Sequence, residues 1–232
     1  KLKFPAKIVV SKNTPQIKID AIKEHGADLI LFGGTYDEAE RKAKELAWKD
    51  GYTYISPYND KLTIAGHGTV GLEIIEALPR ADIVIVPVGG GGLISGISIA
   101  MKSIKPNVKI IGVQSEASPV MYESLRAGRI VDAQIAEETI AEGLAGGIEK
   151  DTITFKIAQE NVDEMLLVHE ETIKRAVYFL WTWEKQVAEG SGAAAIAPIM
   201  ENNSLFAGKT VVAVITGGNI DTKLLQSIVA SE

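Results

Sequence analysis

The chain has 232 residues, with 24 lysines and arginines against 30 aspartates and glutamates and no cysteine. Because the charges are interspersed and the net charge is -6, nucleic acid and anionic membranes are poor candidate partners, and a small-molecule ligand is favoured. The absence of cysteine excludes disulfides, thiolate metal sites and a cysteine nucleophile. No apolar run reaches the roughly 20 residues that span a bilayer, and the first residues lack a signal-peptide pattern, so we expect a cytoplasmic protein.

Short apolar runs rich in β-branched residues alternate with longer amphipathic stretches along the chain. This pattern predicts strands at residues 6–10, 28–32, 52–55, 83–88, 109–113, 165–168 and 210–216. It predicts helices between them at residues 15–26, 36–50, 64–78, 93–103 and 170–185. Such alternation predicts parallel α/β layers, in which ligands gather at the C-terminal ends of the strands.

A lobe boundary is expected in the loop at residues 56–61, which contains Pro57, Asn59 and Asp60. We therefore divide the chain into the remainder of a small lobe at residues 1–62 and a large lobe at residues 63–232. The apolar run at residues 6–10 would begin a parallel sheet with no earlier strand or helix beside it. We therefore expect further chain upstream of it.

Four consecutive glycines, Gly89, Gly90, Gly91 and Gly92, lie between a predicted strand and a predicted helix. Glycine costs roughly 0.5–1 kcal/mol relative to alanine inside an element, so the run needs a reason. One interpretation is a flexible turn, and the other is a phosphate cradle of converging backbone N–H groups at the positive end of the helix. The spacing of the glycines does not match a dinucleotide-binding turn cleanly. The glycines are also not followed by the lysine and Ser or Thr of a nucleoside-triphosphate loop, so such a loop is not favoured.

Two further glycine-containing segments lie nearer the C-terminus. The last predicted strand runs into Thr216-Gly217-Gly218-Asn219, where the backbone can approach a ligand closely or make a plain turn. The segment Glu189-Gly190-Ser191-Gly192-Ala193 precedes a helix of small residues and is nonspecific by itself.

The glycine run and the segments Ala65-Gly66-His67-Gly68-Thr69, Thr139-Ile140-Ala141-Glu142-Gly143 and Thr216-Gly217-Gly218-Asn219 occur in an order that resembles the pyridoxal-phosphate-dependent serine/threonine dehydratases. The wider family includes serine racemases, and the match runs from about Ala6 to Asp221. The resemblance implies a fold-type-II α/β enzyme with two parallel-sheet lobes, incomplete here at the N-terminus. It implies pyridoxal 5'-phosphate as cofactor, an amino-acid substrate and a homodimer or higher homo-oligomer. The activity implied is that of a threonine ammonia-lyase, which eliminates the β-hydroxyl of threonine or serine and releases ammonia and a 2-oxo acid.

The resemblance also implies roles for individual residues. The backbone amides of Gly89, Gly90, Gly91 and Gly92, with Leu93, would hold the cofactor phosphate. Thr216 matches the position whose hydroxyl bonds the pyridine nitrogen. Gly143 matches a glycine whose backbone lies against the cofactor, and Glu189 would lie near the ring.

The sequence departs from the family pattern at several positions. Glu142 stands where the family usually has aspartate, and Gly190 stands where it has proline. Gln114 occupies the first ligand position of a cation site that some members have, so we expect no metal. The Ser-Phe-Lys-x-Arg segment that supplies the Schiff-base lysine should precede Ala6, and it does not occur in these 232 residues. We therefore assign no catalytic residue in this chain.

Several other candidate residues receive structural interpretations. Thr154-Phe155-Lys156 imitates the lysine segment, but it falls where the family has a surface helix, so Lys156 is predicted to be solvated. His25, His67 and His169 show no partnership typical of catalysis. Phe179, Trp181 and Trp183 are predicted to pack in the core or between lobes, because they lie on a long amphipathic helix.

Alternatives to an active ammonia-lyase remain at this point. The chain could belong to a non-catalytic paralogue or partner subunit that retains the phosphate cradle. It could also belong to a serine racemase. A nucleotide-dependent protein that uses the glycine loop is a weaker alternative.

Overall fold

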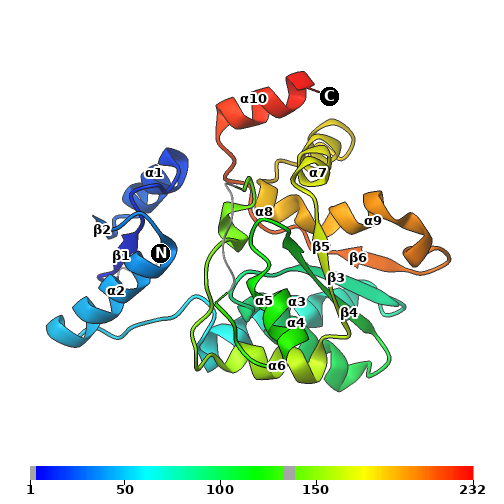
Figure 1. Ribbon diagram of the computed structural model, residues 1–232, viewed down its shortest axis with the longest axis horizontal. Coiled ribbons are helices and arrows are strands. Elements are labelled where there is room, and N and C mark those ends of the chain that lie inside the picture. The colour runs from blue at the N-terminus through cyan, green and yellow to red at the C-terminus, as the bar shows by residue number, and fades with distance from the viewer. Residues whose placement is uncertain (1–3, 133–138, 232) are drawn as a thin grey trace.

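The computed structural model describes residues 4–132 and 139–231 and divides them between two parallel sheets (Figure 1). In chain order the elements are β1 Lys7–Val10, α1 Gln16–Glu24, β2 Asp28–Leu31, α2 Tyr36–Asp50, α3 Lys61–Ala77, β3 Ile83–Pro87, α4 Gly92–Ile104, β4 Lys109–Ser115, α5 Val120–Ala127, η1 Glu142–Leu144, α6 Ile153–Asn161, β5 Glu164–Val168, α7 Glu170–Thr182, α8 Gly190–Ala193, η2 Ala194–Ile196, α9 Ala197–Glu201, η3 Asn203–Phe206, β6 Val211–Ala213 and α10 Thr222–Ser231.

The small unit consists of β1, α1, β2 and α2, and its two strands pair in parallel. The helix α2 has the predicted bounds because local signals fix both of its ends. The Thr35 side chain accepts from the Glu38 backbone while the Glu38 carboxylate accepts from the Thr35 backbone, which completes a capping box. At the other end Gly51 adopts a left-handed conformation, φ 72°, that terminates the helix.

The prediction of a strand at residues 52–55 is wrong. The structure has no strand there, and Tyr52 and Ile55 are 47% and 73% exposed. A β-branched and aromatic run forms a strand only where a neighbouring edge pairs with it. Within the described residues the small sheet contains β1 and β2 alone, so this segment instead joins the two units.

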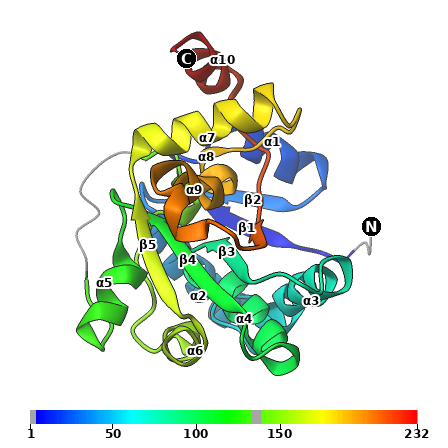
Figure 2. The same ribbon diagram turned by 90° about the vertical axis from the view of Figure 1, so that its right-hand side faces the viewer.

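The large unit is built on a four-stranded parallel sheet with the strand order β5-β4-β3-β6. Alternate residues of β3 pack into two hydrophobic cores, one on each face of the sheet, because successive side chains on a strand point to opposite faces. Ile83 and Ile85 pack on the face covered by α7, η2 and α9, whereas Val84 and Val86 pack against α4. Figures 1 and 2 show these helix layers on either side of the sheet.

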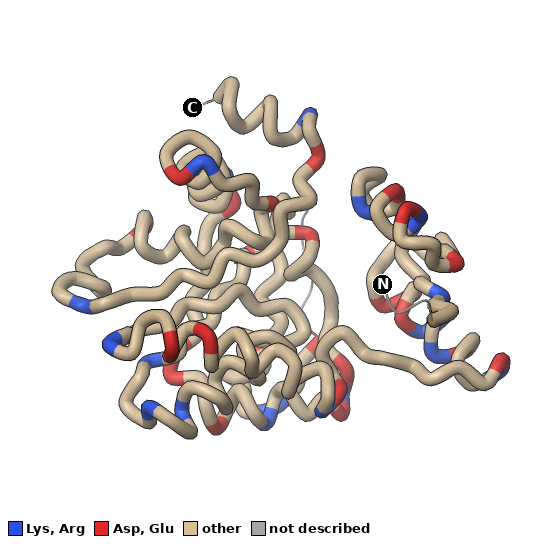
Figure 3. The backbone as a smooth tube through the Cα atoms, turned by 180° about the vertical axis from the view of Figure 1, so that it is seen from behind, with Lys and Arg blue, Asp and Glu red and all other residues tan. Residues whose placement is uncertain are grey.

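The predicted parallel α/β architecture is therefore confirmed, with adjusted boundaries. The strands predicted at residues 83–88, 109–113 and 165–168 are present, and the one at residues 210–216 is shortened to Val211–Ala213. Basic and acidic residues are interspersed in both units (Figure 3). None of the helices in the described ranges has the length and apolar character needed to cross a bilayer.

Glycines bring α3 and α4 into close contact. A methyl group on Gly71 would lie 3.0 Å from the Ile97 carbonyl oxygen, and one on Gly96 would lie 2.6 Å from the Gly68 backbone nitrogen. These distances leave no room for a side chain at the crossing. The crossing fixes the position of α4, whose N-terminal end carries the glycine run.

Candidate cofactor site

The two segments with the strongest sequence signals follow neighbouring strands. The glycine run begins two residues after the end of β3, and Thr216 comes shortly after β6, which pairs with β3 in parallel. Along the chain β3 is followed by β4 and β5 on one side, and the chain then returns to place β6 on the other side. Such a reversal of strand order opens a crevice at the carboxyl ends of the strands, where ligands of α/β proteins bind.

The glycine run presents unpaired backbone donors. Within the described residues, the N–H groups of Gly89 to Leu93 donate no hydrogen bond, although Gly91 and Gly92 are buried. Gly91 has φ 87°, a left-handed conformation that favours glycine. Buried N–H groups need an acceptor, and those at a helix N-terminus favour an anion. The loop therefore fits a phosphate group.

Gly143, the glycine that the resemblance places against the cofactor, lies beside this loop. A methyl group on Gly89 would lie 3.2 Å from the Gly143 carbonyl oxygen, so the two backbones are in close contact. The Gly143 N–H donates to the Ser191 hydroxyl at 2.8 Å. The segment containing Glu189 is thereby held beside the glycine run.

Glu189 and Thr216 lie on the same side of the crevice. The Glu189 N–H donates to the Gly217 carbonyl at 2.9 Å, and the Thr216 N–H donates to the Gly192 carbonyl at 3.4 Å. The Thr216 side chain is exposed, and its hydroxyl has no hydrogen-bond partner among the described residues. The structure thus brings together the residues predicted from the sequence, and their roles toward a cofactor remain proposals.

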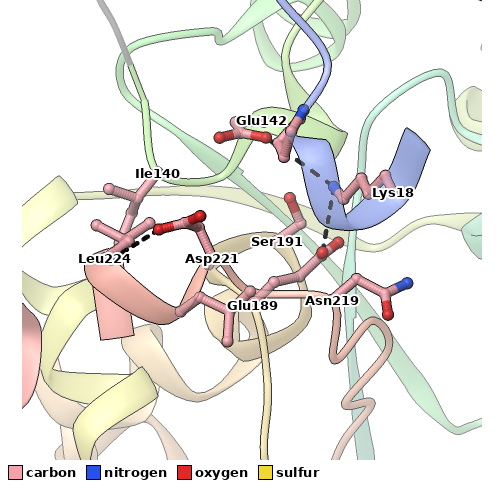
Figure 4. A pocket seen from close by; sticks show the side chains of 11 residues that line it. Lys18, Ile140, Glu142, Glu189, Ser191, Asn219, Asp221 and Leu224 are labelled. Carbon is pink, nitrogen blue, oxygen red and sulfur yellow. Dashed lines mark hydrogen bonds and ion pairs between the residues drawn. The ribbon is translucent and has the colours of Figure 1, made fainter. Parts of the chain in front are cut away.

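A small pocket next to these residues is lined by side chains of both units (Figure 4). Lys18 of α1 reaches across, with Nζ 3.1 Å from Glu189 Oε2 and 4.0 Å from Glu142 Oε2. Apart from this ion pair, the buried Glu189 Oε2 accepts no hydrogen bond from the described residues. Burial raises the pKa of Glu142, Lys18 opposes the rise, and the negative charges of Glu189 and Asp221 add to it.

Some residues that shape the site carry no sequence signal. Glu170 accepts from the Thr139 hydroxyl at 2.6 Å and from the Ile140 N–H at 2.9 Å, which anchors the segment that leads to Gly143. Tyr58 lies on the glycine loop, since a methyl group on Gly92 would be 2.8 Å from the Tyr58 Cα. Burial raises the pKa of Tyr58, so its phenol stays neutral. These contacts join residues far apart in the chain, which explains why local patterns missed them.

The remaining candidates lie outside this crevice. The Lys156 side chain is 80% exposed, which confirms that it is solvated. His169 pairs with Glu116 at 2.7 Å on the surface. Gln114 is buried, and its side-chain oxygen accepts from the Tyr122 N–H at 2.8 Å at the start of α5. Within the described ranges, no three His, Asp or Glu side chains form a group suited to a metal ion.

The fold and the crevice define a parallel α/β protein with an anion-binding loop at the reversal of strand order. The model of the family described as pyridoxal-phosphate dependent enzymes matches residues 1–217, so the chain belongs to this family. The cofactor of the family is pyridoxal phosphate, as the resemblance implied.

Relatives and solved structures agree with this assignment. An L-threonine ammonia-lyase of Thermotoga maritima is 45% identical over 226 residues, which are 97% of this chain and 56% of that protein. The structure of threonine deaminase isoform 2 from Solanum lycopersicum has a TM-score of 0.88 at 39% identity and covers 97% of this chain and 62% of that one. Maize serine racemase has a TM-score of 0.87 at 30% identity and covers 98% of this chain and 70% of that one. These structures confirm the fold class, and the chain spans little more than half the length of the ammonia-lyase from T. maritima.

Proposed function

We propose that this chain forms the cofactor-binding part of an ammonia-lyase that acts on L-threonine or L-serine. The names of similar relatives, which include L-threonine ammonia-lyases, support this activity. The observation that carries the assignment of the site is the run of unpaired backbone donors at Gly89 to Leu93. A bound phosphate would supply the acceptor that these donors lack.

The resemblance implies the roles of the residues, and their positions in the crevice support them. Pyridoxal phosphate, when bound, supplies an electron sink for the bond that breaks at the substrate α-carbon. Gly89, Gly90, Gly91, Gly92 and Leu93 would bind the phosphate through their N–H groups. The positive end of α4 adds to the attraction, because the phosphate carries negative charge.

On the ring side of the site, Thr216 would donate or accept a hydrogen bond at the pyridine nitrogen. A hydroxyl, unlike a carboxylate, does not hold that nitrogen protonated, which suits β-elimination. The Gly143 backbone would lie against the cofactor, and Glu189 would lie near the ring. The resemblance assigns the lysine that holds the cofactor to the segment upstream of Ala6.

The experiment uses the full-length protein, loaded with pyridoxal phosphate and supplied with L-threonine or L-serine. We expect ammonia and a 2-oxo acid in equal amounts. Chiral analysis of the remaining serine tests the racemase alternative, which the similarity to maize serine racemase favours. Rapid formation of D-serine with little 2-oxo acid would contradict an ammonia-lyase, and absence of both products would favour a non-catalytic paralogue.

We further propose the small lobe at residues 1–62 and the large lobe at residues 63–232. The two separate sheets support this division. By similarity to the family, the protein would be a cytoplasmic homodimer or higher homo-oligomer. Light scattering after size-exclusion chromatography measures the mass of the assembly, and a monomer at micromolar concentration would contradict the proposal.

A further inference from the structure

We propose that Thr154 is a positioning residue for the phosphate loop. Its hydroxyl fixes the peptide between Gly90 and Gly91 so that the Gly91 N–H is presented to an anion. This inference rests on the proposed function of the loop. It gives a role to the segment that imitates a lysine motif, through its threonine rather than through Lys156.

The hydroxyl of Thr154 is part of a chain of hydrogen bonds in which each donor is fixed. Thr154 is fully buried, and its Oγ1 donates to the Gly90 carbonyl oxygen at 2.7 Å. Its Oγ1 also lies 2.8 Å from Oγ1 of Thr152. A carbonyl oxygen only accepts, so the single hydroxyl proton of Thr154 is committed to Gly90. Thr152 must therefore donate to Thr154, and successive bonds in such a chain polarise one another.

This chain of bonds sets the direction of a donor in the loop. The described backbone contains no cis peptide bond, so the Gly90 carbonyl and the Gly91 N–H point in opposite directions across one planar peptide. Because the carbonyl is held toward α6, the N–H is directed away from α6. That N–H donates to no described residue, which leaves it available to a ligand.

Packing around Gly91 holds the same peptide in place. A methyl group on Gly91 would lie 3.1 Å from the Thr154 Cβ and 2.9 Å from the Met121 Cε, so both side chains close one side of the loop. The first turn of α6 is itself anchored, since the Ile153 N–H donates to the Asn59 side chain at 3.0 Å. Thr154 therefore lies on a fixed helix end, as a positioning role requires.

The test removes the hydroxyl and retains the shape. Thr154→Val is nearly isosteric with threonine, and Thr154→Ser retains the hydroxyl. Thr172→Val removes the hydroxyl of another buried threonine, on α7 and away from the loop. Full-length protein is stripped of cofactor, and the Kd values of pyridoxal phosphate, pyridoxal and inorganic phosphate are measured by titration. The phosphorus NMR shift of the bound cofactor reports on the phosphate environment.

We expect Thr154→Val to bind pyridoxal phosphate about fivefold to tenfold more weakly, because one oriented hydrogen bond to the phosphate is impaired. The binding of inorganic phosphate should weaken by a similar factor. Pyridoxal, which lacks the phosphate, should bind to Thr154→Val as tightly as to the natural protein. Thr154→Ser and Thr172→Val should bind all three like the natural protein. The phosphorus shift should change in Thr154→Val alone.

The results separate a failure of the role of Thr154 from a failure of the phosphate cradle. Unchanged affinity for pyridoxal phosphate in Thr154→Val, or equal losses for pyridoxal and its phosphate, would overturn the role of Thr154. If the natural protein itself binds pyridoxal as tightly as pyridoxal phosphate, the proposed phosphate cradle is wrong instead. If Thr154→Val does not fold, the pair Thr154→Ser and Thr154→Ala, which differ only by the hydroxyl, makes the same comparison.

Discussion

Replacing Gly96 with alanine tests the close contact between α3 and α4. The added methyl group would lie 2.6 Å from the Gly68 nitrogen and 2.7 Å from the His67 Cβ. Carbon contacts are optimal at about 3.5 Å or more, so the helices must separate by several tenths of an ångström. The Gly68 nitrogen and the Ile64 carbonyl oxygen, which also lies against this position, belong to the backbone and cannot rotate away as a flexible side chain can.

The expected destabilisation combines two effects of opposite sign. Overpacking of a rigid contact costs about 1–3 kcal/mol, and alanine recovers about 1 kcal/mol of helix propensity over glycine. The melting temperature of a domain this size changes by roughly 2–4 °C for each kcal/mol. Because the contact is with backbone atoms, we expect the upper end of the packing cost, a net loss of about 2 kcal/mol, so Gly96→Ala should lower the melting temperature by about 4–8 °C.

Gly66 provides a matched control on α3. A methyl group there would meet no atom within 4 Å, so alanine gains helix propensity without a clash. Gly66→Ala should raise the melting temperature by about 2–4 °C. Calorimetry on the two variants and the natural full-length protein compares the signs directly. A stabilising effect of Gly96→Ala equal to that of Gly66→Ala would refute the close helix contact.

Three further predictions concern charge, capping and the cofactor. The pKa of Glu142 is raised in the folded protein, so the folded state retains a proton that the unfolded chain releases. The contribution of Glu142 to the free energy of unfolding therefore falls as the pH rises above 4.5, the ordinary pKa of the group. Glu142→Gln should flatten that part of a stability profile measured by denaturant titration, and an unchanged slope would contradict the raised pKa. Thr35→Ala should reduce the free energy of unfolding by about 1 kcal/mol through loss of the cap of α2, and Thr35→Ser should retain it, as denaturation curves can show. Thr216→Val should lower kcat/KM of the loaded protein by about tenfold or more by removing a hydrogen bond to the ring, whereas Thr216→Ser should stay near the natural value. Equal kinetics for both variants at Thr216 would refute its role.

Local signals explain the elements that the sequence predicted well. The bounds of α2 follow from Thr35 and Glu38 at one end and Gly51 at the other, all adjacent in sequence to the helix. The apolar run at residues 83–88 could be recognised because a strand buried on both faces is continuously apolar. Resemblance then grouped the glycine run with Gly143, Glu189 and Thr216, and the structure places these segments together.

Tertiary context explains the elements that were missed. The prediction that Phe179, Trp181 and Trp183 pack in the core or between lobes is confirmed for Phe179, which packs against a hydrophobic core. It is wrong for Trp181 and Trp183, which are 42% and 71% exposed. They lie at the end of α7, where helical periodicity no longer determines burial. The contact between Thr154 and Gly90 joins residues 64 positions apart, so no local pattern contains it.

The place of β6 in the sheet has a consequence for the order in which the protein is made. This strand is the last in the described chain, yet it pairs with β3, the first strand of its sheet. A ribosome that has synthesised the glycine run must still add more than a hundred residues before Thr216 emerges. The two sides of the crevice can meet only late in synthesis, because the contact between them closes a long loop. Tight cofactor binding would therefore report that the large sheet is complete.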